Sequence, residues 1–136
     1  HKKLGFVLSD KSMKKDTQWS IDAMHTKTPS QETKIRSLSG GNQQKVIIAR
    51  ELESGPSVLV MAHPTRGLDI GATSFVHDQM IAARARGVGI LLISADFDEI
   101  LEMSDRIVVC FEGRIMGEFS GSKPPINEIS LAMTGK

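Results

Sequence analysis

Two short apolar runs separated by a helical pattern constrain this chain most. VLVMA at residues 58–62 and GILLIS at 89–94 have the length of strands, and turn-forming residues flank them. The segment 71–86 between them repeats apolar residues at helical spacing, which places four side chains on one face: Phe75, Val76, Met80 and Ala83. A strand, helix, strand order in which the strands alternate little predicts a parallel sheet buried between helices.

Bulk properties narrow the class of protein. The chain has 136 residues, enough to bury the core of one domain, and a formal net charge of +1, which argues against a nucleic-acid binder held by a basic field. Its one cysteine, Cys110, lies in the run IVVC, and we predict a buried, inert thiol. No apolar run is long enough to cross a bilayer as a helix.

The segment LSGGNQQK at residues 38–45 carries the strongest chemical signal. Ser39 is a typical N-cap, and we predict a helix over 41–52 that Gly55-Pro56 terminates. Two glycines at a helix start let a ligand approach the backbone N–H groups, and the helix dipole favours an anion there. Taken alone, Ser39-Gly40-Gly41 is better explained as a cap followed by a turn, because such turns are frequent.

The flanking sequence is less regular. We expect an extended stretch at 4–8, a polar loop at 9–16, a helix at about 14–25 and a loop at 27–34 around Pro29. Trp19, in that first helix, has two open interpretations: a core anchor, or part of a surface that docks on another subunit. His25 and His77 are expected to be solvated or packed side chains rather than metal ligands.

Towards the C-terminus, Asp96 is predicted to cap a short helix, with Asp98 and Glu99 in its first turn. The runs 106–112 and 114–120 flank Gly113 and predict a β-hairpin. A short helix at 127–133 follows.

Longer stretches of sequence indicate a family. Residues 38–72, LSGGNQQKVIIARELESGPSVLVMAHPTRGLDIGA, resemble the segment from the signature to the D-loop of an ATP-binding cassette (ABC) ATPase. LSGGNQQK together with PTRGLD and GA resembles the second nucleotide-binding domain of bacterial importer ATPases for simple sugars. Residues 94–118, SADFDEILEMSDRIVVCFEGRIMGE, continue the resemblance, and their SAD…DEIL form is similar to the nucleoside-type branch.

The resemblance implies roles for individual residues. Ser39, Gly40 and Gly41 would contact the γ-phosphate of an ATP held by the opposite cassette, because cassettes of this family pair head to tail. Asn42 and Gln43 would support the start of the signature helix. Asp69 would be the D-loop aspartate that crosses the dimer interface.

The same resemblance marks positions where catalytic groups are missing. Strand 58–62 would be the Walker B strand, whose usual terminal aspartate and glutamate are here Ala62 and His63. Ala62 cannot hold metal-bound water, and His63 alone is a weak candidate for a base, so we interpret it as a tolerated remnant. The position of the usual switch histidine is Ala95. We therefore expect no catalytic residue and no metal ligand in this chain.

No G-x-x-x-x-G-K-[ST] occurs in the sequence. The resemblance places HKKLGFVL just beyond the family's Q-loop, so we expect the C-terminal piece of a second cassette that lacks the P-loop strand. The expected fold is α/β, a partial P-loop NTPase domain with a mostly parallel sheet, flanking helices and a C-terminal hairpin. Residues from about 1 to 37 would be a remnant of the helical subdomain, and about 38–136 would form the core.

The implied parent protein is an ABC importer ATPase for simple sugars or nucleosides that uses ATP and Mg²⁺. Its partners would be the other cassette, transmembrane permease subunits and a solute-binding protein, without nucleic acid, at the cytoplasmic face of the cell membrane. The chain alone is expected to bind no cofactor, to hydrolyse no ATP and to be marginally stable or self-associating. Two other classes remain open: a non-hydrolysing regulatory or interaction module, and an ABC-type ATPase that acts on nucleic acid.

Overall fold

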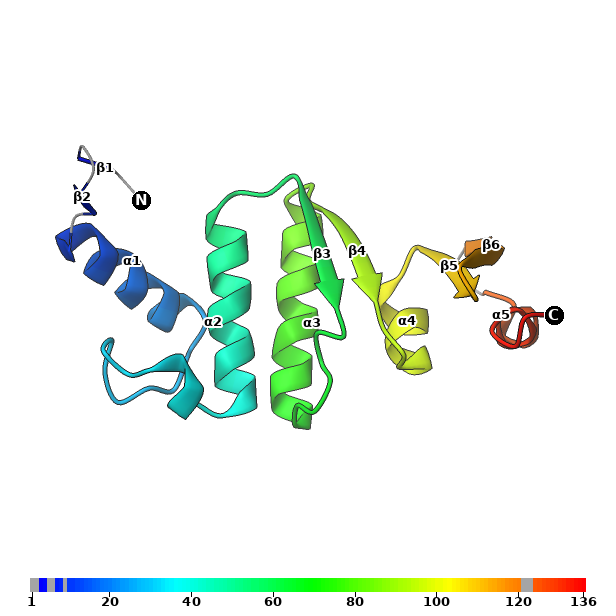
Figure 1. The fold of residues 1–136 in the computed structure, drawn as a ribbon, viewed down its shortest axis with the longest axis horizontal. Helices are drawn as coiled ribbons and strands as arrows, with labels where there is room; N and C mark the ends of the chain where they lie inside the picture. Colours follow the sequence, from blue (N-terminus) through cyan, green and yellow to red (C-terminus); the bar gives the residue numbers. More distant parts are fainter. Residues whose placement is uncertain (1–2, 5–6, 9, 121–123) are drawn as a thin grey trace. The chain divides into compact units, whose positions relative to one another are not determined.

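A computed structural model describes residues 3–4, 7–8, 10–120 and 124–136. The chain divides into two compact units, His1–Leu91 and Leu92–Lys136, and each is treated by itself below. The ribbon in Figure 1 carries the element labels used from here on.

The first helix is longer than predicted. α1 spans Asp10–Ala23 and includes most of the segment expected to be a loop, so that prediction is wrong. Polar composition concealed the helix, which is stabilised by charge spacing: Lys14 lies 3.3 Å from Asp10, one turn earlier. The extended stretch predicted at 4–8 is described only at its ends, where β1 (Lys3–Leu4) and β2 (Val7–Leu8) pair antiparallel.

α1 ends in a Schellman turn that determines where the chain goes next. His25 has φ 48°, the left-handed conformation, and its N–H donates to the carbonyl of Asp22. The N–H of Thr26 reaches the carbonyl of Ile21 at 2.9 Å, and the Thr26 side chain is buried. The segment after this turn is a loop, as predicted, until the short 3₁₀ helix η1 (Ile35–Ser37).

Two helices form the centre of the first unit. α2 spans Gly40–Glu53 and α3 spans Ile70–Ala85, which confirms both predicted helices to within one residue at each end. They lie side by side in Figure 1, and a Cβ placed on Gly41 would be 2.9 Å from the Cβ of Ala72. The buried apolar residues of the two helices are Ile48, Ala49, Val76, Met80 and Ala83. Their first turns are thus in direct contact.

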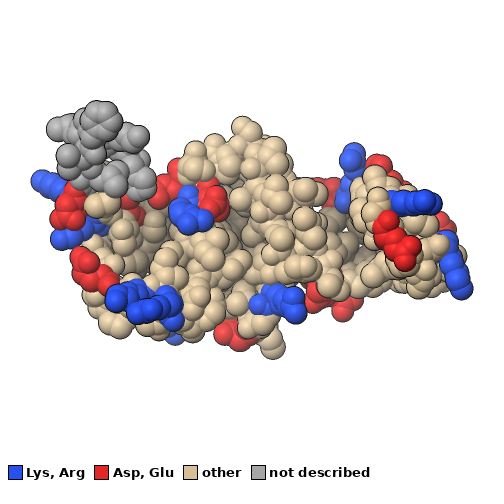
Figure 2. Space-filling model, in the orientation of Figure 1, with Lys and Arg blue, Asp and Glu red and all other residues tan. Residues whose placement is uncertain are grey.

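β3 (Val58–Ala62) and β4 (Gly89–Ile93) are neighbouring strands that run in the same direction, as predicted (Figure 1). Their burial differs from the prediction. In β3, Leu59 and Met61 are buried, whereas Val58 and Val60 are 64% and 61% exposed. One face of the strand therefore packs on the unit and the other is open, and Figure 2 shows a largely uncharged surface over β3.

The second unit contains the short helix and the hairpin predicted from sequence. α4 spans Phe97–Met103, and the Asp96 carboxylate accepts from the N–H groups of Asp98 and Glu99, which confirms the predicted cap. β5 (Arg106–Phe111) and β6 (Arg114–Ser120) pair antiparallel, and α5 spans Ile126–Ala132. The hairpin and α5 bury a common core of Ile107, Val109, Ile129 and Ala132.

The predicted burial of Cys110 is wrong. Side chains of β5 alternate between faces, so Ile107 and Val109 point into the core while Val108 and Cys110 are exposed. The turn between the strands places Glu112 and Gly113 at φ 45° and 76°, as a two-residue type I′ hairpin requires.

Candidate functional site

The N-terminus of α2 is open rather than capped by a side chain. Ser39 occupies the predicted N-cap position with an extended backbone, but its hydroxyl makes no capping bond to the helix. The first intrahelical bond runs from the N–H of Gln43 to the carbonyl of Ser39 at 2.9 Å. Because the N–H groups of a first helical turn have no acceptor within the helix, those of Gly40, Gly41 and Asn42 are available to a ligand.

Side chains next to this turn are bonded to one another instead. Asn42 donates through Nδ2 to the Oγ of Ser39 at 2.9 Å, and its Oδ1 accepts from the backbone N–H of Lys27 at 2.9 Å. Gln43 donates to the carbonyl of Leu38 at 2.8 Å, which ties the chain before the helix to its second turn. Asn42 and Gln43 thus both bond to residues that precede the helix, and their expected role in supporting the helix start remains a prediction.

A hollow of about 300 Å³ lies in front of this helix tip. α2 contributes its first two turns, α3 its first turn, and the loop after α1 a single residue. The lining residues are Lys27, Ser39, Gly41, Asn42, Lys45, Asp69, Gly71 and Ala72. The structure therefore brings Ser39, Gly41 and Asn42 together with Asp69, which lies 30 residues from Ser39 in the sequence.

Lys27 and Lys45 are site residues that the sequence analysis did not identify. The Lys45 ammonium donates to the carbonyl of His25 at 3.3 Å and lies 4.3 Å from the centre of the Phe75 ring. This side chain thus joins the end of α1 to both α2 and α3. No local pattern in the sequence predicts a bond between residues 20 positions apart, although Lys45 belongs to the LSGGNQQK segment that carries the strongest chemical signal.

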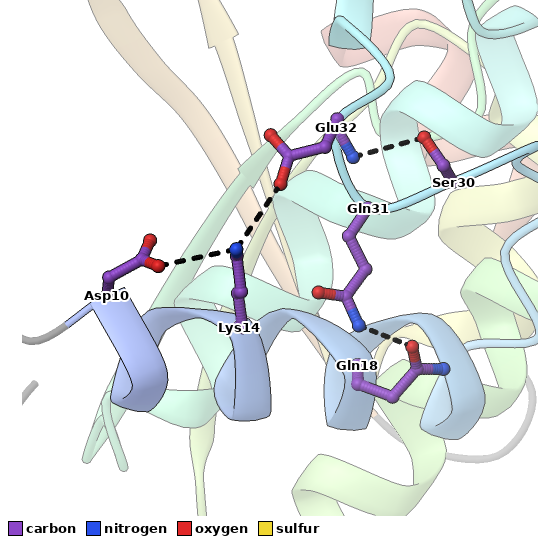
Figure 3. A network of polar contacts seen from close by, with 6 residues as sticks. All are labelled: Asp10, Lys14, Gln18, Ser30, Gln31 and Glu32. Atoms are coloured by element: carbon purple, nitrogen blue, oxygen red, sulfur yellow. Dashed lines mark hydrogen bonds and ion pairs between the residues drawn. The ribbon is translucent and has the colours of Figure 1, made fainter.

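The loop that carries Lys27 is tied back to α1 by polar contacts (Figure 3). Gln31 donates to the side chain of Gln18, and Glu32 lies 4.0 Å from Lys14. Within the loop, the N–H of Glu32 donates to the Oγ of Ser30 at 3.2 Å. Each such surface contact contributes little to the free energy of folding, but together these contacts restrict where the loop can lie.

Asp69 is the N-cap of α3. Its Oδ1 accepts from the N–H of Ala72 at 2.9 Å, so the start of α3 is occupied by its own carboxylate. The Asp69 carboxylate therefore disfavours an anion at the tip of α3, whereas no side chain caps the tip of α2. The expected role of Asp69 in crossing an interface remains a prediction.

The positions at the end of β3 lie outside this hollow. Ala62 is the last residue of the strand, and His63 follows in the left-handed conformation at φ 50°; both are exposed. Ala95 lies in the second unit, between β4 and α4. Within the described ranges, no group of three or more His, Cys, Asp or Glu side chains is arranged to hold a metal ion.

The fold is that of an ATP-binding cassette. The ATP-binding cassette MJ1267 of an ABC transporter aligns with a TM-score of 0.71 and 24% identity, over 96% of this chain and 49% of that one. A nucleotide-free cassette from an ABC transporter aligns with a TM-score of 0.74 and 24% identity, over 96% and 50%. The structure is thus a partial domain of the P-loop NTPase type that ends in an antiparallel hairpin and a short helix.

The sequence relatives are import ATP-binding proteins, and this chain matches the C-terminal part of their cassette. It is 48% identical over 132 residues to the galactose/methyl galactoside import ATP-binding protein MglA 2 of Photobacterium profundum, which is 96% of this chain and 26% of the relative. MglA of Vibrio vulnificus is 47% identical over 90% of this chain and 24% of its own. The guanosine import ATP-binding protein NupO of Bacillus subtilis is 44% identical over 95% and 25%.

The chain therefore spans about a quarter of the length of the curated relatives it matches. No protein-family model matches it. Among the helices of the described residues, none has the length and apolar character to cross a membrane.

Proposed function

We propose that this chain is part of the ATP-binding subunit of an ABC importer for simple sugars or nucleosides. In this proposal, the α2 tip supplies the signature that contacts ATP held by a partner cassette, in complex with permease subunits and a solute-binding protein at the cytoplasmic face of the membrane. Residues from about 1 to 37 would belong to the helical subdomain and about 38–136 to the core. Homology to sugar and nucleoside import proteins supports the class, and the open α2 tip supports the role.

The single observation that carries the proposal is the unbonded first turn of α2. A serine at an N-cap ordinarily satisfies one of the free N–H groups with its own hydroxyl, but Ser39 does not. Its Oγ accepts from Asn42, which leaves the hydroxyl hydrogen for another acceptor. A terminal phosphate group placed there would receive the Ser39 hydroxyl and the backbone N–H groups together.

The residues fit the phosphates of ATP but not its Mg²⁺. Glycine at position 40 leaves the helix tip accessible, and the N–H donors match an anion. At the end of β3, Ala62 and His63 supply no carboxylate, and Mg²⁺ prefers oxygen ligands. We therefore propose that the chain completes an active site whose P-loop, metal and carboxylates belong to the partner cassette, while its own Walker B positions are degenerate.

A chimera tests the proposal. The 136 residues replace the matching stretch of the Photobacterium profundum protein, and ATP hydrolysis and galactose uptake are measured with its permease. We expect Gly40→Asp to abolish both activities, because a carboxylate at the helix tip repels and obstructs the phosphate. The control is Ser37→Ala, a change close to α2 that removes one hydrogen bond but adds no charge at the helix tip, and it should leave both activities in place.

A second variant tests the degenerate half of the proposal. Placing aspartate and glutamate at positions 62 and 63 should change the hydrolysis rate little if the working site is the one that this chain completes in trans. A large rise in rate would show that the missing carboxylates limit turnover, and would refute the asymmetric arrangement. Full hydrolysis by the Gly40→Asp chimera would refute the role of the α2 tip.

A further inference from the structure

The contacts of Asn42 connect two parts of the site that the sequence keeps apart. One end of its amide receives the backbone N–H of Lys27, from the loop after α1, and the other end donates to Ser39 at the tip of α2. Among the residues that the structure describes, Asn42 is the side chain that joins this loop to the signature serine.

The direction of these bonds follows from chemistry. A backbone N–H can only donate, so the atom of Asn42 that faces Lys27 must be the carbonyl oxygen Oδ1. The amide cannot then be flipped, and its Nδ2 must face Ser39 as a donor. Ser39 Oγ is consequently an acceptor towards Asn42, and its single hydrogen is directed elsewhere. With the opposite amide orientation, Ser39 would donate to Asn42 and have no hydrogen left for a phosphate.

The position of Lys27 is itself held by three features. The Schellman turn at His25 directs the chain away from α1, and the Thr26 side chain that follows is 6% exposed. Lys45 donates to the carbonyl of His25, which fastens this turn to α2. The N–H of Lys27 therefore lies next to Asn42 because the turn before it is held by α1 on one side and by Lys45 of α2 on the other.

We propose that Asn42 is a positioning residue whose amide, held by the Lys27 backbone, directs the Ser39 hydroxyl towards the bound phosphate. This inference rests on the proposed function of the α2 tip and deepens it. Asn42 acts through Ser39, so its contribution to phosphate binding disappears when the Ser39 hydroxyl is absent.

The test uses the chimera described above and measures two quantities: the ATP concentration that gives half-maximal hydrolysis, which reports phosphate binding, and the rate at saturating ATP. Asn42→Ala should weaken phosphate binding by about tenfold, the equivalent of one hydrogen bond to a charged group. Ser39→Ala should weaken it by a similar factor. The Ser39→Ala/Asn42→Ala double variant should bind no more weakly than either single variant, because the two residues act as one unit.

Two further variants control for folding and for charge. Lys27→Ala removes the ammonium but keeps the backbone N–H, so amide exchange at residue 27 should stay slow, whereas Asn42→Ala should accelerate it. Asn42→Ser adds no charge, and its short hydroxyl cannot reach both Lys27 and Ser39, so it should fold and still lose phosphate binding. It thus replaces Asn42→Ala if that variant does not fold.

The outcomes separate the two ideas. If the Gly40→Asp chimera hydrolyses ATP at the full rate, the proposed anion site is refuted, and the positioning role with it. If Gly40→Asp abolishes hydrolysis but the Asn42→Ala chimera needs no more ATP than the unmodified chimera, only the positioning role is refuted. Additive losses in the double variant would also refute it, because they would show that Asn42 acts independently of Ser39.

Discussion

The contact between Gly41 and Ala72 allows a sharp test of how α2 and α3 position the site. A methyl group added at Gly41 would place its carbon 2.9 Å from the Cβ of Ala72, closer than two such atoms can approach. Both carbons are fixed to helical backbone, so the clash is relieved only by moving the helices apart. Gly40, one residue earlier, is a matched control, since its added methyl would lie 4.0 Å from a Leu68 methyl.

The difference between the two variants isolates the cost of the contact. Forcing an extra methyl group into a packed position costs about 1–3 kcal/mol. Replacing glycine by alanine in a helix returns about 1 kcal/mol or less, and this gain is similar at the two neighbouring positions. Gly41→Ala should therefore be about 1–3 kcal/mol less stable than Gly40→Ala.

Urea unfolding measures this difference, with the fluorescence of Trp19 as the probe. Trp19 is the one tryptophan of the chain and lies on α1, in the same unit as α2 and α3. Removing the opposing methyl should restore the space: the Gly41→Ala/Ala72→Gly double variant should be more stable than the sum of the single effects by about 1 kcal/mol or more. Equal stability of Gly41→Ala and Gly40→Ala, or strict additivity in the double variant, would refute the packing argument.

Three further changes test local features of the fold. Asp69→Ala should lower the free energy of unfolding by about 1 kcal/mol because α3 loses its N-cap, whereas Asp69→Asn should lower it less; equal losses in urea unfolding would contradict the cap. His25→Gly should raise the melting temperature, since glycine adopts the left-handed conformation of His25 without the cost of about 1 kcal/mol that a side chain incurs there; a lower melting temperature would contradict this. Glu112→Asn should stabilise the hairpin by about 0.5–1 kcal/mol, because asparagine tolerates the positive φ of a type I′ turn, and unchanged hairpin amide exchange would contradict it.

Much of the local structure follows from the sequence. Residues that favour caps and turns mark the helix boundaries: helices begin or end next to Ser39, Gly55-Pro56 and Asp96. The hairpin follows in the same way from two apolar runs around Gly113. These features depend on backbone conformation and on bonds within a few residues, which a local pattern records.

The wrong predictions concern features that amino-acid composition does not determine: the start of α1 and the burial of Cys110. α1 has few apolar residues, so hydrophobic periodicity indicated a loop in its first half, although acid and base spaced one turn apart favour a helix. In RIVVCF every interior position is apolar, so the sequence could not show which side chains face the core. The alternation of the strand decided that, and it exposed Cys110.

The strand ahead of His63 illustrates a more general limit. A run of apolar residues is compatible with a strand that is covered on one face and with a strand that is covered on both. The sequence shows which side chains favour burial, but not which other elements pack against them. In β3, Leu59 and Met61 pack on the unit while Val58 and Val60 remain open. The solved cassettes of the same fold are about twice as long as this chain, so an apolar outer face agrees with a sheet that is covered further in a longer cassette. The same reasoning applies to the site, because the Lys27–Asn42–Ser39 contacts depend on a turn 15 residues away and become visible only once α1 and α2 are placed together.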